Sequence, residues 1–222
     1  MRAVIFDLDG TLADTSKDLI AAANACFEAR GLGALLDPVG DAGTAFRGGR
    51  AMLTLGVERA EGYGAALVEE DYPRLLAFYG ENIDAQTELY PGAVEAVEAL
   101  RHDGFAVGIC TNKPEGLAEE LLARLGIRGL FGSMIGADTL PVRKPDPAPY
   151  FAALEQAGGT RGLLVGDTET DRKTARAANC PSVLVTFGPD GRGVEALEPE
   201  ATIDHFDELP GVVARLLAEG TG

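Results

Sequence analysis

Residues 4–15 read VIFDLDGTLADT, an apolar run that ends in two aspartates, Asp7 and Asp9, followed by a glycine and a threonine. In an extended chain residues i and i+2 point the same way, so both carboxylates can face one cavity beyond the end of the strand. Ligands bind at that edge in open parallel sheets. Two like charges this close are unfavourable without a proton or cation between them. The stretch therefore indicates either an acidic turn capped by Thr11 or a cation-binding site.

The composition is that of an ordinary soluble globular protein, with 46% hydrophobic and 24% charged residues among 222. The net charge of −16 argues against nucleic acid or an anionic membrane surface as a partner. No apolar run approaches the roughly 18 residues of a membrane span. Three scattered cysteines, Cys26, Cys110 and Cys180, favour reduced thiols and a cytoplasmic location. A phosphate site in so acidic a chain would need local cations or a metal.

Segments rich in Val, Ile and Leu alternate with helical patterns along most of the chain, which is typical of a parallel sheet with crossover helices. The expected strands lie at 2–8, 105–110, 133–136, 162–166 and 182–186. The expected helices begin after Pro91, Pro114 and Pro147, and a last one spans 207–219. The predicted fold class is therefore α/β, with a Rossmann-like parallel-sheet core.

The segment 15–87 breaks this alternation, because its pattern is helical throughout and contains no expected strand. Its roughly seventy residues exceed the length of an ordinary crossover between parallel strands. The sequence therefore predicts a helical cap at 15–87, inserted after the first strand into an α/β core made of 1–14 and 88–222.

A second acidic cluster, GDTETD at 166–171, again follows an apolar strand. Alone it could be a helix N-cap whose acidic residues favour the helix dipole. Together with the first cluster, Asp167 and Asp171 offer the hard oxygen ligands that suit Mg²⁺, with Glu169 nearby.

Polar and cationic groups fill two loops between these clusters. Thr111 and Asn112 precede an expected helix in ICTNKP (109–114), and Lys144 lies between prolines in RKPDP (143–147). A helix N-terminus is a favourable place for an anion. Of the four lysines, Lys113 and Lys173 also lie in or beside these loops, where either a solvated or a functional role is open.

These four motifs, in this order, resemble those of the haloacid dehalogenase superfamily of phosphohydrolases, over essentially the whole chain. DGTLADT, TNKP and VRKPDPAP are most similar to the phosphoglycolate phosphatases within it. The resemblance implies a Mg²⁺-dependent phosphomonoesterase acting on a small phosphorylated metabolite, most closely 2-phosphoglycolate. It also implies a cap that closes over the site and selects the substrate.

The resemblance assigns the catalytic roles. Asp7 would attack phosphorus and form an aspartyl-phosphate. Asp9 would be general acid to the leaving group and then general base for water, with Thr11 orienting it. Thr111 would hold the phosphoryl oxygens and Lys144 would neutralise charge. The backbone N–H groups of Leu8, Asp9 and Asn112 would complete the phosphate site.

The resemblance also implies the metal ligands: the Asp7 carboxylate, the Asp9 backbone carbonyl and Asp167, with Asp171 binding directly or through water. In the cap, Arg47 and Arg50 flank two glycines in FRGGR (46–50) and could grip a substrate carboxylate. Alternatively, both arginines form surface ion pairs.

Other functions remain open from the sequence alone. The substrate could be a sugar phosphate, a nucleotide or pyrophosphate, and a phospho-aspartate signalling module uses similar residues. A mutase is less favoured, and a dehalogenase would not need an acid at Asp9. No nucleic-acid or membrane partner is expected, and the chain is expected to be a monomer or a weak homodimer.

Overall fold

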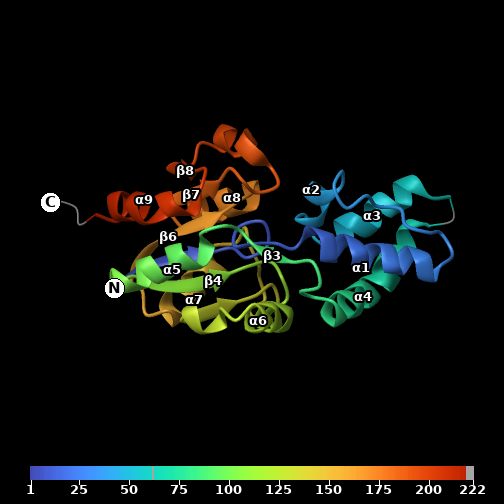
Figure 1. Ribbon diagram of the computed structural model, residues 1–222, viewed down its shortest axis with the longest axis horizontal. Coiled ribbons are helices and arrows are strands. Elements are labelled where there is room, and N and C mark those ends of the chain that lie inside the picture. The colour runs from blue at the N-terminus through green and yellow to red at the C-terminus, as the bar shows by residue number, and fades with distance from the viewer. Residues whose placement is uncertain (62, 219–222) are drawn as a thin grey trace. The chain divides into compact units, whose positions relative to one another are not determined.

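The computed structural model describes residues 1–61 and 63–218 of the 222-residue chain, and its contacts divide the chain into two units (Figure 1). The sheet unit comprises Met1–Ala13 and the residues from Leu89 onward, and the helical unit comprises Asp14–Glu88. The chain passes between the units at β2 (Ala13–Asp14) and β3 (Glu88–Leu89), which form a two-stranded sheet. The roles of core and cap for these segments stay predictions. Residues 62 and 219–222 of those segments lie outside the described residues.

The sheet unit is built on six parallel strands in the order β5-β4-β1-β6-β7-β8. The strands are β1 (Arg2–Phe6), β4 (Ala106–Cys110), β5 (Ser133–Ile135), β6 (Arg161–Gly166), β7 (Ser182–Val185) and β8 (Ala201–Ile203). All five strands expected from the sequence are present, and the α/β parallel-sheet prediction is confirmed. The sixth strand, β8, was not predicted, because three residues at a sheet edge carry no clear apolar run.

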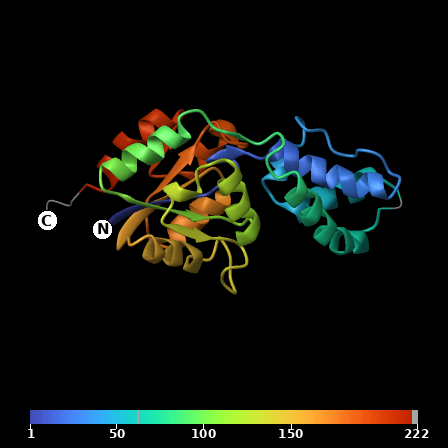
Figure 2. The same cartoon turned by 60° about the horizontal axis from the view of Figure 1, so that its bottom comes forward.

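Helices cover the sheet on both sides (Figure 2). They are α5 (Ala93–His102), α6 (Glu115–Arg124), α7 (Ala148–Gln156), α8 (Glu169–Ala177) and α9 (Leu209–Leu216), with short 3₁₀ helices η1 (Arg128–Leu130), η2 (Gly191–Leu197) and η3 (Phe206–Glu208). On one face α7 and α8 bury a cluster that includes Ile5, Leu164 and Tyr150. The four central strands β4, β1, β6 and β7 are almost entirely buried, as expected for a sheet covered on both faces. That burial makes the strand ends rigid supports for polar loops.

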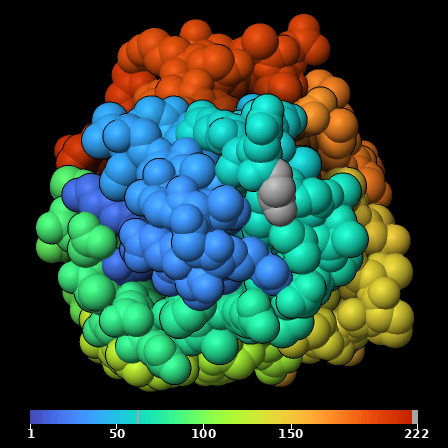
Figure 3. All heavy atoms as spheres, turned by 90° about the vertical axis from the view of Figure 1, so that its right-hand side faces the viewer, coloured from blue at the N-terminus to red at the C-terminus, as the bar shows by residue number. Residues whose placement is uncertain are grey.

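The helical unit contains α1 (Ser16–Ala29), α2 (Ala42–Ala45), α3 (Gly49–Arg59) and α4 (Ala65–Glu81), seen from one side in Figure 3. Gly56 lets α3 approach α1 closely, since a Cβ there would lie 2.4 Å from Phe27 Cζ. The fully buried Asp71 accepts bonds from Arg30 at 2.6 and 2.8 Å and from the Tyr63 hydroxyl at 3.0 Å. A buried carboxylate is tolerated only when it is paired in this way.

Across the described residues, no helix combines the length and apolar character that crossing a membrane requires.

Candidate active site

Three neighbouring strands, β4, β1 and β6, end at one edge of the sheet, and a polar residue predicted to be functional follows each. Thr111 follows β4, Asp7 follows β1, and Asp167 follows β6. Strand pairing fixes these positions, because Asp7 N donates to Val165 O at 2.9 Å and Thr111 N donates to Ile135 O at 2.9 Å. The sheet therefore gathers residues that are more than 50 positions apart along the chain.

Asp7 is held by a cation and by its own backbone. Its Oδ2 lies 2.8 Å from Lys144 Nζ, and its Oδ1 accepts from Leu8 N at 2.7 Å. Burial raises the pKa of Asp7 to about 6, with Lys144 opposing the shift and Asp171 adding to it. Asp7 is therefore ionised at neutral pH, with one oxygen held by the lysine.

Lys144 lies in the loop between β5 and α7 and is 2% exposed. Its Nζ also donates to Asp171 Oδ1 at 2.7 Å, while Asn112 Nδ2 donates to the Lys144 carbonyl at 3.0 Å. Burial opposes the charged form, but the carboxylates of Asp171 and Asp7 outweigh it and raise the pKa of Lys144. The lysine thus carries a permanent positive charge between two aspartates.

Asp171 anchors this arrangement from the first turn of α8. Its Oδ2 accepts from Asp167 N, Thr168 N and Thr168 Oγ1 at 3.2, 3.2 and 2.9 Å, closing a capping box. Both oxygens of Asp171 are therefore engaged, one with α8 and one with Lys144.

Asp167 differs from Asp171 because only one of its oxygens is engaged. Its Oδ1 accepts from Thr11 Oγ1 at 2.6 Å, while its buried Oδ2 has no hydrogen-bond partner among the described residues. Burial, reinforced by the charges of Asp171 and Asp7, raises the pKa of Asp167 well above its ordinary value. A buried carboxylate oxygen without a partner calls for a proton or a cation.

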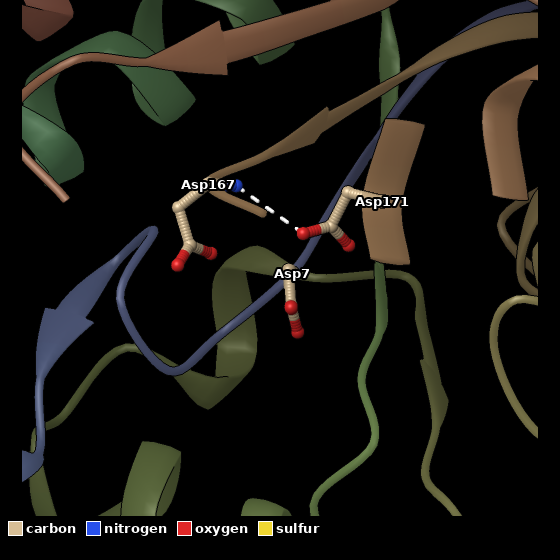
Figure 4. Close-up of side chains that lie close together, drawn as sticks. All are labelled: Asp7, Asp167 and Asp171. Atoms are coloured by element: carbon tan, nitrogen blue, oxygen red, sulfur yellow. Dashed lines mark hydrogen bonds between the residues drawn. The ribbon is translucent and has the colours of Figure 1, made fainter. Parts of the chain in front are cut away.

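One carboxylate oxygen from each of Asp7, Asp167 and Asp171 lies within 4.8 Å of the other two, and Figure 4 shows the three side chains close together. Hard carboxylate oxygens are the ligands that Mg²⁺ prefers. The donor set and the unpartnered Asp167 Oδ2 therefore fit a divalent cation.

Two glycines give these side chains room. A Cβ on Gly166 would lie 2.3 Å from Asp171 Cβ, and one on Gly188 would lie 2.8 Å from Gly10 O and 2.9 Å from Asp167 Cβ. Contacts under 3.0 Å force a displacement. The loop after β7 therefore forms a wall of the site, and no motif in the sequence singles out Gly188.

The structure adds contacts for the remaining site residues. Thr11 is fully buried and its hydroxyl donates to Asp167 Oδ1 at 2.6 Å, while the role expected for it, orienting Asp9, stays a prediction. Lys113, left open as a solvated or functional residue, is buried and its Nζ donates to both oxygens of Asp9 at 2.8 and 2.9 Å. Thr111 is also buried, and its Oγ1 accepts from Lys113 N at 3.2 Å.

The two candidate arginines belong to the helical unit and differ in their contacts. Arg50 donates to both oxygens of Glu69 at 2.7 and 3.0 Å and stacks on Tyr72, with its Cζ 3.7 Å from the ring centroid. Arg47 is exposed and forms no ion pair with any residue that the structure describes. The surface ion pair considered from the sequence is thus present for Arg50.

Comparison with known proteins identifies relatives of this chain over nearly its whole length. The family model for haloacid dehalogenase-like hydrolases matches residues 1–179. The chain is 38% identical to the phosphoglycolate phosphatase of Mesorhizobium japonicum, covering 99% of this chain and 97% of the relative. It is also 38% identical to that of Cereibacter sphaeroides ATCC 17029, covering 98% and 100%. The crystal structure of a predicted phosphoglycolate phosphatase from Haemophilus somnus superposes with a TM-score of 0.84 at 27% identity, covering 95% of this chain and 96% of that one.

Proposed function

The chain belongs to the haloacid dehalogenase-like hydrolases, and on that premise we propose that it is a Mg²⁺-dependent phosphatase that hydrolyses 2-phosphoglycolate to glycolate and phosphate. The observation that carries the proposal is Asp7, paired with Lys144 at 2.8 Å beside the carboxylates of Asp167 and Asp171. The substrate is supported by curated relatives named phosphoglycolate phosphatase that are 38% identical over nearly the whole chain.

In the first step an oxygen of Asp7 attacks phosphorus, and the bond from phosphorus to the ester oxygen breaks. The products are an aspartyl-phosphate on Asp7 and glycolate, whose ester oxygen takes a proton from Asp9. Lys144 orients the attacking carboxylate and neutralises charge as it builds on the phosphoryl oxygens. Because this lysine is 2% exposed, its charge acts with little screening by water.

In the second step Asp9 takes a proton from a water molecule, and the resulting hydroxide attacks phosphorus. The bond between phosphorus and Asp7 breaks, releasing inorganic phosphate and restoring the Asp7 carboxylate. Asp9 thereby regains the proton that it gave to the leaving group, and the net reaction consumes one water. Thr111 at the end of β4 supports the phosphoryl oxygens in both steps.

Asp7 and Asp167 would hold the metal, with the Asp9 carbonyl as a further ligand and Asp171 acting through water or directly. Mg²⁺ bound there would neutralise charge on the phosphoryl oxygens and so favour attack on phosphorus by the Asp7 carboxylate. Asp171 would also keep Lys144 in place, since the lysine donates to it at 2.7 Å.

The helical unit would act as the cap, with Arg47 gripping the glycolate carboxylate. Arg47 is preferred to Arg50 because the Arg50 guanidinium already holds Glu69. A free guanidinium can offer two parallel N–H groups to a carboxylate.

The test is kcat/KM across 2-phosphoglycolate, a sugar phosphate, a nucleotide and pyrophosphate, each with Mg²⁺ and with EDTA. The proposal expects multiple turnovers with Mg²⁺, none with EDTA, and the highest kcat/KM for 2-phosphoglycolate. A higher value for another phosphate would refute the substrate. A single stable phosphorylation without turnover would indicate a signalling module and refute the enzyme.

A further inference from the structure

Lys113 is a buried cation that the mechanism above does not use. Its side chain is 3% exposed, and its Nζ donates to Oδ1 and Oδ2 of Asp9 at 2.8 and 2.9 Å. The two residues are 104 positions apart and are brought together by the pairing of β1 with β4.

The backbone of Lys113 is fixed on both sides. Its N–H donates to Thr111 Oγ1 at 3.2 Å, its carbonyl accepts from Ala137 N at 2.9 Å, and Pro114 follows directly before α6. An ammonium is buried at such a position only if a carboxylate compensates its lost hydration. Each of the two loop aspartates thus has its own lysine, Lys144 for Asp7 and Lys113 for Asp9.

We infer that Lys113 is a positioning residue that holds the Asp9 side chain at the place from which its protonated carboxyl group passes a proton to the leaving group. The inference rests on the function proposed above. An aspartate side chain turns about two torsions, and proton transfer needs its oxygen within hydrogen-bond reach of the ester oxygen. A contact to both oxygens fixes both torsions. A displacement of about 1 Å in such a group can lower the rate on the order of 100-fold.

This role has a consequence that a purely structural lysine would not have. An alkoxide leaving group needs the proton from Asp9, whereas p-nitrophenolate leaves readily without it. The value of kcat/KM covers only the steps up to departure of the leaving group, so it isolates this proton transfer from the later attack of water. Loss of Lys113 is therefore expected to harm alkyl phosphates far more than aryl phosphates.

The experiment compares the wild-type chain with Lys113→Met, using kcat/KM in Mg²⁺ for 2-phosphoglycolate, ethyl phosphate and p-nitrophenyl phosphate. We expect kcat/KM to fall on the order of 100-fold for both alkyl esters and by less than about threefold for the aryl ester. Lys113→Arg, which can still donate to both carboxylate oxygens, is expected to recover most of the loss. The matched control is Lys173→Met, since Lys173 is exposed and its Nζ lies 3.0 Å from Glu169 Oε2 of its own helix.

Two outcomes overturn the inference. An equal loss for all three esters would mean that Lys113 only supports the fold. A loss for 2-phosphoglycolate but not for ethyl phosphate would mean that Lys113 binds the substrate carboxylate instead of positioning Asp9. If Lys113→Met does not fold, Lys113→Gln carries the same expectation, because it removes the charge while its shorter, polar side chain is better tolerated beside Asp9. Failure of the proposed function is separate, since it would appear as wild-type protein that prefers another substrate.

Discussion

Replacing Lys144 by Met removes the ammonium that joins Asp7 to Asp171. Nζ lies 2.8 Å from Asp7 Oδ2 and 2.7 Å from Asp171 Oδ1, and the side chains of Lys144 and Asp171 are 1% and 0% exposed. Removing one partner of a buried ion pair destabilises a protein by about 3–5 kcal/mol, because the remaining charge stays buried without compensation. We therefore expect Lys144→Met to lower the free energy of unfolding by about 3–5 kcal/mol at pH 8 without metal.

The loss should be smaller at pH 5. In the folded wild-type protein the pKa of Asp7 is raised from 3.8 to about 6, and Lys144 is the largest influence that opposes this shift. Without the lysine the pKa rises further, so Asp7 takes up a proton at pH 5 and no longer carries an unpaired charge. Because the pKa of Asp7 is higher in the folded than in the unfolded protein, protonation of Asp7 stabilises the folded protein at low pH. That stabilisation is lost as the pH rises through the pKa of Asp7 in the folded protein.

The assay is urea unfolding at pH 5 and pH 8 in EDTA, followed by circular dichroism, for the wild type, Lys144→Met, Lys144→Arg and the exposed control Lys173→Met. Lys144→Arg keeps the positive charge, so its free energy of unfolding should fall less than that of Lys144→Met. A destabilisation below about 1 kcal/mol at both pH values would refute the buried-pair reasoning.

Three further predictions follow from the same contacts. Gly188→Ala should lower kcat at least tenfold, because the new Cβ would lie 2.9 Å from Asp167 Cβ. Gly193→Ala, where a Cβ meets open space, should leave kcat unchanged. Similar kcat values for both variants would contradict the conclusion that the loop after β7 shapes the site. The rise in melting temperature caused by Mg²⁺, measured by scanning fluorimetry, should be larger at pH 7.5 than at pH 5. The reason is that protons compete with the metal for Asp7, whose pKa is about 6. A rise that does not depend on pH would argue against Asp7 as a metal ligand. Arg47→Ala should raise KM for 2-phosphoglycolate at least fivefold, whereas Arg50→Ala should change it less than twofold, because the Arg50 guanidinium is already bound to Glu69. Equal KM values for both variants would show that Arg47 does not bind the substrate.

The main elements of the fold could be predicted because parallel strands buried on both faces leave long apolar runs in the sequence. The same logic predicted the site, since polar residues directly after such runs must meet at one sheet edge. Asp7, Lys144, Asp167 and Asp171 do come together there. Strand β8 escaped prediction because it is short and only its last residue is buried.

Pairings between side chains were harder to predict than positions. Lys113 follows a buried strand, as many solvated lysines do, and nothing local shows that its ammonium reaches Asp9 across the sheet edge. The hydroxyl of Thr11 had two carboxylates within plausible reach, and only the three-dimensional turn after β1 directs it to Asp167. Such side-chain pairings depend on which strands are neighbours in the sheet, and the order of the strands cannot be deduced from any single segment of the sequence.

The most direct test of the central claim is multiple-turnover release of inorganic phosphate from 2-phosphoglycolate by the wild type and by Asp7→Asn, each in Mg²⁺. An amide cannot form the aspartyl-phosphate, while its shape and its place beside Lys144 are kept. The account predicts sustained phosphate release by the wild type and none above background by Asp7→Asn. Normal turnover by Asp7→Asn would contradict it.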